Sequence, residues 1–308
     1  MPTLGQVAGG IKGRDAHART GVHRAAAPNG GADYHAGVAD HPQVRPAATV
    51  LLLRSGAAPV EILLLRRSGS SSFAADAWVF PGGVVDESDR HLPAGLWGGI
   101  DPAALTQRFA ADEATVLGFH VSAVRETFEE AGVLLARPRY AGVKAGAGAD
   151  GEHRRVELNP QRRRLRAALA AGRLDLAGWL TQRRLVLDLG CLTYLSRWVT
   201  PVAQPRRYDT CFFVARAPVG QIVAHDRAET TGQRWLPAAT ALDEHEAGRL
   251  ELMHPTVRTL QALAVHDSVD AVITAAAAQA HVRSILPHAE VDADGRVVSI
   301  VDPDEVRG

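Results

Sequence analysis

The chain of 308 residues is poor in several residue types, and each shortage excludes a class of protein. Its two cysteines, Cys191 and Cys211, have no CxxC or metal-type spacing, so a disulfide framework or cysteine zinc site is not expected. Two small buried thiols are predicted instead. Lysine occurs only at Lys12 and Lys144, and the formal net charge is zero, which argues against broad electrostatic binding to nucleic acid or anionic membrane.

Long apolar runs are also missing. No stretch reaches the roughly 18 uninterrupted apolar residues that a membrane helix needs, and the N-terminus has no apolar core of a secretory signal. We therefore expect a cytoplasmic protein without nucleic-acid or membrane partners; a homodimer is compatible with the sequence.

What the chain does contain is enough for one large domain, with 46% apolar and 22% charged residues. Residues 1–45, rich in Gly, Ala, His and Pro, are expected to be a disordered leader. Residues 46–285 are expected to form the main domain, with helical insertions at about 90–120 and about 155–190. Residues 286–308 are expected to be a tail, in which the Asp-Gly turn of "DADGRVVSIVDP" precedes a short strand.

Apolar runs bounded by turn residues predict the strands of a core sheet. "AATVLLLR" (47–54) and "VEILLLRR" (60–67) predict a β-hairpin or adjacent strands, and "AWVFPGG" (77–83) predicts a short strand ending in a Pro-Gly-Gly turn. Further strands are predicted at 191–201, 207–218 and 230–237, and helices at 102–131, 158–172, 238–248, 254–266 and 268–282. Strands before, between and after helices predict an α/β (α+β) sandwich around a mixed sheet.

The stretch "AVRETFEEAGVLL" (123–135) places three carboxylates within five positions. On a helix, Glu126, Glu129 and Glu130 fall within about 100° of one another, and Gly132 is a natural left-handed C-cap. Like charges at this spacing repel, so the face is either solvated or built for a hard divalent cation, which prefers carboxylate oxygens. The helix alone leaves both interpretations open.

A second motif favours the metal site. "FPGG" (80–83) and "RETFEEAGV" (125–133) resemble the two halves of the Nudix box, G-x5-E-x7-R-E-U-x-E-E-x-G-U, with U an aliphatic residue. Asp89 stands at the first Glu of that pattern and Thr127 stands at an aliphatic position. Between Asp89 and Arg125 the chain has 35 residues (90–124) where the pattern has seven, an insertion of 28. The peroxisomal CoA diphosphatase type of Nudix hydrolase and its bacterial relatives interrupt the box at this point, and the resemblance spans roughly residues 47–265.

The resemblance implies a Nudix-type α/β/α sandwich and a metal-dependent hydrolase of nucleoside diphosphates linked to another moiety. It implies that Mg²⁺ or Mn²⁺ is held by Glu126, Glu129, Glu130 and the carbonyl of Gly83. Glu129 is also implied in catalysis, and Arg125 is implied to orient a helix carboxylate, with Asp89 as its anchor. The residues between Asp89 and Arg125 are expected to loop out.

Other members of the family need a further loop carboxylate as ligand or base. "HDRAETTGQRW" (225–235) offers Asp226 and Glu229. Glu229 is favoured, because its place six residues before Trp235 resembles that of the distal Glu in several Nudix proteins. A guanidinium suits phosphate recognition, and an aromatic ring can stack on a base. These considerations give five candidate substrate residues: Arg66, Arg67, Arg206, Arg207 and Tyr208.

The expected substrate is a small nucleotide diphosphate, first of all CoA or acyl-CoA, which would yield 3′,5′-ADP and a phosphopantetheine product. Better-known CoA-specific relatives carry Arg and Gly where this chain has Ser72 and Asp76. An ADP-ribose, NADH or dinucleotide diphosphatase therefore remains the alternative enzyme. A non-catalytic Nudix-fold regulator that binds nucleotide is the alternative from a different class.

Overall fold

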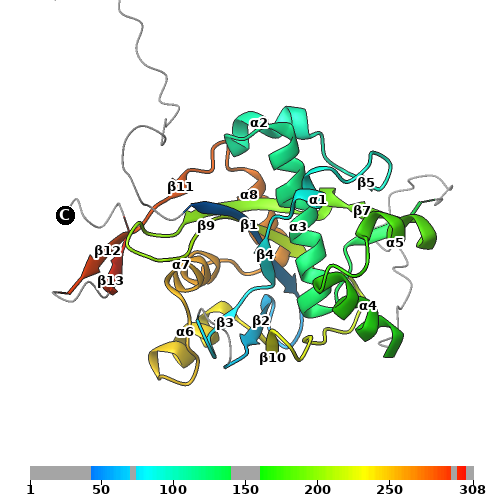
Figure 1. Cartoon of the computed structure of the whole chain (residues 1–308). Helices are drawn as coiled ribbons and strands as arrows, with labels where there is room; N and C mark the ends of the chain where they lie inside the picture. Colours follow the sequence, from blue (N-terminus) through cyan, green and yellow to red (C-terminus); the bar gives the residue numbers. More distant parts are fainter. Residues whose placement is uncertain (1–42, 70–73, 140–159, 293–296, 303–308) are drawn as a thin grey trace, which may run out of the picture. The chain divides into compact units, whose positions relative to one another are not determined.

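The computed structural model describes residues 43–69, 74–139, 160–292 and 297–302 (Figure 1). Almost all of the expected leader, residues 1–45, lies outside this part. The first strand begins at Val44, so the last two residues assigned to the leader belong to the sheet.

One mixed sheet organises the described residues. Its strands follow the order β10-β2-β1-β9-β8-β11, with β3 paired to β2 and β4 paired to β1. They are β1 (Val44–Arg54), β2 (Glu61–Arg67), β3 (Trp78–Val79), β4 (Gly82–Val84), β8 (Thr193–Val199), β9 (Arg207–Arg216), β10 (Thr230–Leu236) and β11 (Ser284–Ile285). The expected hairpin is confirmed, because β1 and β2 are antiparallel with Leu53 opposite Ile62. The sheet is mixed because β1 pairs in parallel with β9.

Helices cover both faces of this sheet, which confirms the α/β/α sandwich (Figure 1). Successive side chains of a strand point to opposite faces. Accordingly Val50 and Leu52 of β1 join one buried cluster, whereas Leu51 and Leu53 join the other. The first cluster includes α3 (Glu113–Ala131), α4 (Pro160–Ala170) and α5 (Leu176–Arg183); the second includes α6 (Ala238–Glu246), α7 (His254–Leu263) and α8 (Val269–Ala277).

The acidic motif lies at the end of α3, a helix of 19 residues. Asp112 caps its start by accepting a hydrogen bond from the Thr115 N–H at 2.7 Å, and Gly132 ends it with φ of 73°. The expectation that residues 90–124 loop out is therefore wrong for 113–124, which extend the same helix. None of the helices in the described ranges is long and apolar enough to cross a membrane.

Two short helices precede α3 in this region. They are α1 (Glu87–Arg90) and α2 (Pro102–Phe109). The helical run expected over 102–131 is interrupted at Ala110, which has a left-handed φ of 45°. The break changes the direction of the chain between α2 and α3. The buried rings of Phe109 and Phe119 stack on each other and hold the two helices together.

The Pro-Gly-Gly turn expected at 81–83 is a strand in the structure. Gly82 and Gly83 belong to β4, antiparallel to β1, with Gly82 opposite Thr49. A Cβ at Gly82 would lie 2.5 Å from the Ala48 carbonyl oxygen, so glycine is required by the close approach of β1 rather than by a turn.

The two insertions are joined to each other by a second small sheet. Its strands are β5 (Trp97–Gly98), β7 (Leu185–Asp188) and β6 (Ala136–Pro138), in the order β5-β7-β6. Strand β5 comes from the first insertion and β7 from the second, next to the 3₁₀ turn η1 (Leu189–Cys191). The second insertion therefore contains a strand as well as the expected helices.

The C-terminal tail contains two strands where one was expected. They form the antiparallel pair β12 (His288–Val291) and β13 (Val297–Val301). The Asp-Gly pair expected to turn between them lies outside the described residues. Of the two cysteines, Cys211 is buried as expected, whereas Cys191 is only partly buried; both are free thiols.

His120 of α3 gives a pH-dependent contribution to stability. Its ring is buried between Phe109 and Phe213, and burial lowers its pKa to about 4 despite the hydrogen bond to the Val116 carbonyl. The unfolded chain takes up this proton near pH 6.5, so the contribution is complete above that value and is lost as pH falls toward about 4.

We expect the free energy of unfolding of the wild type to fall by about 2 kcal/mol more than that of His120→Gln between about pH 7.5 and about pH 5. Urea unfolding at both pH values measures this difference. His91→Gln, at an exposed histidine, is the matched control and should keep the pH dependence of the wild type. Equal pH dependence for wild type and His120→Gln would show that the buried imidazole does not act in this way.

Candidate active site

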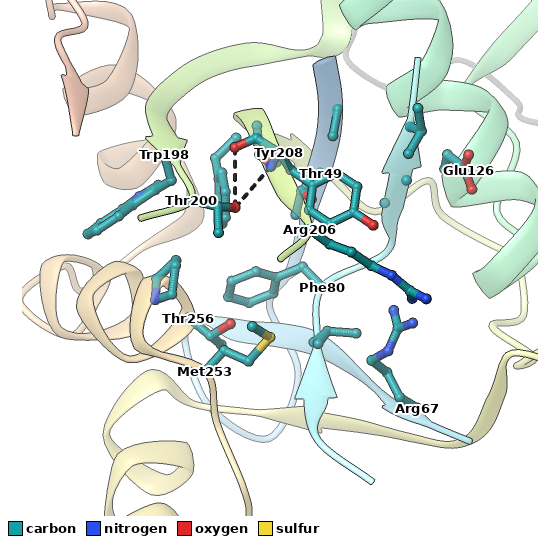
Figure 2. A pocket seen from close by; sticks show the side chains of 18 of the residues that line it. Thr49, Arg67, Phe80, Glu126, Trp198, Thr200, Arg206, Tyr208, Met253 and Thr256 are labelled. Carbon is teal, nitrogen blue, oxygen red and sulfur yellow. Dashed lines mark hydrogen bonds between the residues drawn. The ribbon is translucent and has the colours of Figure 1, made fainter. Parts of the chain in front are cut away.

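A cavity of about 590 Å³ lies where α3, the sheet and the start of α7 meet (Figure 2). Glu126 lies at one side of the view, and Phe80, Trp198 and Met253 gather at the other. The cavity therefore has a charged side and an apolar side, and both are built from segments far apart in the sequence.

The charged wall consists of the three carboxylates at the end of α3. Glu129 and Glu130 are buried and Glu126 is partly buried, so the interpretation as a solvated face is wrong. Strand β4 fixes them: the Gly82 N–H donates to Glu130 Oε2 at 3.0 Å. A Cβ at Gly83 would lie 2.5 Å from the Glu126 carboxyl, so a larger residue here would displace the Glu126 side chain from its place beside β4.

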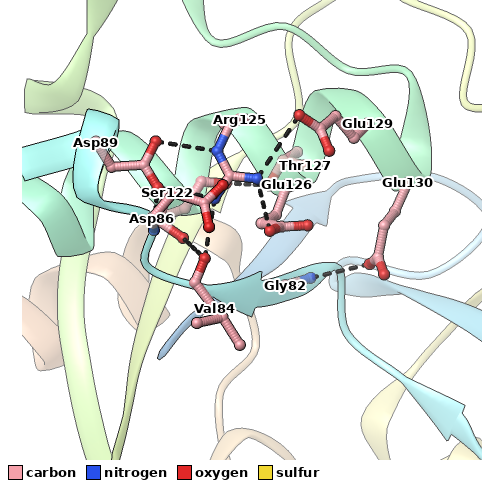
Figure 3. Close-up of polar contacts among 11 residues, drawn as sticks. Gly82, Val84, Asp86, Asp89, Ser122, Arg125, Glu126, Thr127, Glu129 and Glu130 are labelled. Atoms are coloured by element: carbon pink, nitrogen blue, oxygen red, sulfur yellow. Dashed lines mark hydrogen bonds and ion pairs between the residues drawn. The ribbon is translucent and has the colours of Figure 1, made fainter. Parts of the chain in front are cut away.

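Arg125 links the last turns of α3, which carry the three glutamates, to α1 (Figure 3). Its Nε and Nη2 donate to the two oxygens of Asp89 at 3.0 and 2.8 Å, and Nη1 donates to Glu126 Oε1 at 2.7 Å. Asp89 is fully buried, and its Oδ2 also accepts the Asp86 N–H at 2.8 Å. The shorter carboxylate at this position of the box therefore binds Arg125 in a bidentate pair.

Arg166 holds the same turn from the other side, and sequence analysis did not single it out. From α4 in the second insertion, its Nε and Nη2 donate to the carbonyls of Glu129 and Glu130 at 2.9 and 2.8 Å. These carbonyls lie at the C-terminal end of α3, where a cation also opposes the negative end of the helix dipole. The only signal in the sequence was the arginine-rich run "QRRRLR" (161–166), which by itself is typical of a solvated helix face.

Burial raises the pKa values of all three glutamates. Burial raises the pKa of Glu126 to about 7, although Arg125 opposes the shift, and the charges of Asp89 and Glu229 add to it. Burial and then the charge of Glu126 raise the pKa of Glu129 to about 7, and the same two causes hold the pKa of Glu130 well above its ordinary range. The raised pKa values mean that the surrounding residues do not supply enough positive charge to balance three carboxylates. Such a cluster is the environment expected for a bound cation.

The donor set fits a hard divalent cation. Glu129 Oε1 is buried, no described residue donates a hydrogen bond to it, and the nearest guanidinium contact is Arg125 Nη1 at 3.6 Å. As the side chains stand in the described ranges, no three carboxylate, imidazole or thiolate groups converge closely enough to hold an ion. Because Arg125 draws Glu126 toward itself, binding an ion requires side-chain rotation at this turn.

The two candidate carboxylates in the loop before β10, Asp226 and Glu229, differ in whether they face the cavity. Glu229 lines the cavity. Asp226 instead organises its own loop, since its oxygens accept the N–H groups of Ala228, Glu229 and Thr230 at 2.8 to 3.2 Å. Burial opposes these bonds, but together they lower the pKa of Asp226.

This difference predicts opposite phenotypes for the two carboxylates. We expect Glu229→Gln to lower kcat by about 10²-fold with an unchanged free energy of unfolding, because it faces the cavity. Asp226→Ala is expected to cost about 1–2 kcal/mol of stability, because three backbone donors lose their acceptor. Steady-state kinetics and urea unfolding of both variants measure this, and a destabilised Glu229→Gln with normal kcat would reverse the assignment.

The candidate substrate residues divide between the cavity and the surface. Arg67, Arg206 and Tyr208 line the cavity, and in Figure 2 the side chains of Arg67 and Arg206 extend toward the same region. Arg66 and Arg207 do not line it. Arg66 pairs with Asp76 at 3.0 Å, and the Nε of Arg207 donates to the Thr200 carbonyl at 3.2 Å, so the expectation that they contact substrate is not supported by their positions.

Comparison with known proteins identifies relatives for this arrangement. A family model described as the NUDT19 Nudix domain matches residues 101–263. That stretch includes α3 and its glutamates and the loop of Glu229.

Two proteins named acyl-coenzyme A diphosphatase NUDT19 are similar to the chain. The one from Xenopus laevis is 25% identical over 252 residues, covering 72% of this chain and 64% of the relative. The one from Gallus gallus is 32% identical over 255 residues, covering 68% of this chain and 65% of the relative. The chain thus spans slightly less than two thirds of their length.

A solved structure is also similar. The crystal structure of a Nudix hydrolase from Alicyclobacillus acidocaldarius is 30% identical, with a TM-score of 0.62, covering 75% of this chain and 96% of that one. The fold, the interrupted sequence motif and the similar proteins all indicate the same family.

Proposed function

We propose that this chain, which belongs to the Nudix hydrolase family and to its branch with the NUDT19 Nudix domain, hydrolyses the diphosphate bond of CoA or acyl-CoA. The products would be 3′,5′-ADP and phosphopantetheine or its acyl derivative. The observation that carries the proposal is the buried turn of three glutamates in one cavity with Arg67 and Arg206. The printed name of the relatives, acyl-coenzyme A diphosphatase, supports the choice of substrate.

In this proposal Glu126, Glu129 and Glu130 hold a divalent cation, with the Gly83 carbonyl beside them. The family generally needs such an ion; magnesium and manganese both suit these oxygen ligands. When bound, the ion supplies charge neutralisation at the diphosphate and lowers the pKa of water. Arg125 contacts four carboxylates, those of Asp86, Asp89, Glu126 and Glu129, and holds the Glu126 side chain. It therefore acts as a positioning residue rather than as a ligand for substrate.

Glu229 is the proposed general base or additional ligand, because it lines the same cavity as the glutamates of α3. Its charge raises the pKa values of Glu126 and Glu130, which indicates that these carboxylates lie near one another. Arg67 is proposed to bind a phosphoryl oxygen next to the cation site, since its charge in turn lowers the pKa of Glu130. Arg206 and Tyr208 are proposed to contact the nucleotide part.

A substrate panel tests the function. With Mg²⁺ or Mn²⁺, the full chain is incubated with CoA, acyl-CoA, NADH, ADP-ribose and diadenosine polyphosphates, and products are separated by chromatography. We expect 3′,5′-ADP from CoA or acyl-CoA, with the highest kcat/KM of the panel and no turnover after the ion is chelated. Preferential hydrolysis of ADP-ribose, NADH or a dinucleotide would replace the CoA assignment, and saturable binding without turnover would identify a regulator.

A further inference from the structure

The cavity that holds the glutamates is also lined by large apolar side chains from five parts of the chain. They are Phe80, Trp198, Phe212, Met253 and Ile300. We call these five residues the apolar subsite. Figure 2 shows three of them, Phe80, Trp198 and Met253, on the side away from Glu126.

The composition of the apolar subsite suits a flexible chain better than a flat ring. The rings of Phe80 and Phe212 meet at 86° with centroids 6.4 Å apart, so they do not form a slot between parallel faces. Met253 adds an unbranched side chain that adapts to the shape of its neighbour. Thr200, Gln204 and Tyr208 also line the cavity and offer polar groups to the nucleotide part.

One wall of the apolar subsite comes from the C-terminal tail, outside the matched residues 101–263. Ile300 lies in β13, and Asp302 just after it is buried. Asp302 Oδ1 lies 2.8 Å from His254 Nε2, and Oδ2 lies 2.5 Å from Arg258 Nε. Both partners belong to α7, so Asp302 fastens the end of β13 to this helix.

The same pair supports a second wall. The ring of His254 packs against Trp198 at 81°, with centroids 5.9 Å apart. Asp302 therefore fixes the position of Ile300, which lies two residues before it in the chain. It also supports Trp198, because it contacts the His254 ring that packs against Trp198. Loss of the carboxylate would loosen two of the five apolar side chains without touching any residue of the charged wall.

We propose that the apolar subsite binds the acyl chain of an acyl-CoA and that Asp302 is the positioning residue that closes it. This rests on the proposed function, because the diphosphate must lie at the glutamates for the acyl chain to extend to the other side. Each methylene group that becomes buried should strengthen binding about fourfold. The enzyme should therefore prefer acyl-CoA to free CoA, with a preference that grows with chain length until the subsite is full.

The test is the kcat and KM of the full chain for free CoA and for saturated acyl-CoA of increasing length. Ile300→Ser and Asp302→Asn should raise KM for the longer acyl-CoA by about tenfold while kcat, and KM for free CoA, stay within about twofold of the wild type. Ile300→Phe narrows the subsite instead and should shift the preferred chain to a shorter one. Asp302→Glu, which keeps the charge, should restore part of the preference lost in Asp302→Asn.

Matched controls separate this from general destabilisation. Val265→Ser changes an exposed aliphatic residue, and Asp270→Asn breaks the exposed ion pair with Arg216; both should leave the chain-length preference unchanged. An equal loss for CoA and acyl-CoA in the Ile300 and Asp302 variants, or no loss at all, would overturn the acyl subsite while leaving the proposed function intact. A wild type that releases no 3′,5′-ADP from any of these substrates would overturn both proposals.

Discussion

Replacement of Glu130 by Gln is expected to lower kcat by about 10³-fold while the protein remains folded and at least as stable as the wild type. Glu130 is buried, and its Oε2 accepts the Gly82 N–H. A glutamine keeps the volume and this hydrogen bond but removes the charge that a divalent cation requires. Burying a neutral amide costs less than burying a carboxylate, so the metal-free variant should not unfold earlier.

Two measurements check this result. Steady-state kinetics with CoA or acyl-CoA give kcat, and thermal unfolding with and without Mn²⁺ gives the shift in Tm caused by the ion. Wild type should be stabilised by the ion, as expected for a ligand that binds only the folded state, and Glu130→Gln should lose most of that shift. Glu113→Gln, at the exposed start of the same helix, should behave as wild type. Normal turnover in Glu130→Gln would refute the metal site.

The second large effect concerns stability. Arg125→Met is expected to lower the free energy of unfolding by about 3–5 kcal/mol, because it leaves Asp89 and Glu129 buried without their cation. Burial by itself would lower the pKa of Arg125, yet its hydrogen bonds and the charges of Asp89, Glu126 and Glu129 raise it, so the side chain is charged throughout the accessible pH range. Methionine fills a similar volume, which limits the effect to the lost charge and hydrogen bonds.

Urea unfolding of the metal-free protein measures this loss. Arg125→Lys keeps the charge but not the forked geometry, so an intermediate loss is expected. The matched control is Arg216→Met, which removes an exposed ion pair with Asp270 and should cost no more than about 1 kcal/mol. A loss in Arg125→Met as small as that of Arg216→Met would mean that the buried network does not hold the turn together.

Much of the site was predictable because its parts are local. The spacing of Glu126, Glu129 and Glu130 fixes them on one helix face, and Gly132 ends that helix, whatever the rest of the chain does. The apolar runs of β1 and β2 and the order of strands and helices similarly predicted the sandwich. The family resemblance added the first half of the box, with Gly83, which helical periodicity alone could not have linked to α3.

Other features depend on contacts between distant residues. The helix predicted over 102–131 is confirmed for 113–131, but no local signal placed the break at Ala110, whose left-handed backbone separates α2 from α3. The positions of Arg66 and Arg67 show the same limit. They are adjacent in sequence, but neighbouring side chains of a strand point to opposite faces, and only the placement of β2 decided that Arg67 lines the cavity.

The sequence by itself determined the fold class and the helix that carries three glutamates, because periodicity acts over a few residues, and the family resemblance linked the glycines of β4 to that helix. Only the tertiary structure decided that Glu129 and Glu130 are buried, that Arg125 pairs with Asp89, that Arg166 reaches the same turn from the second insertion, and that Asp302 brings the C-terminal strand to the cavity. The physical reason is that burial and ion pairing depend on which distant segments meet, and the chain settles that only when the whole core packs.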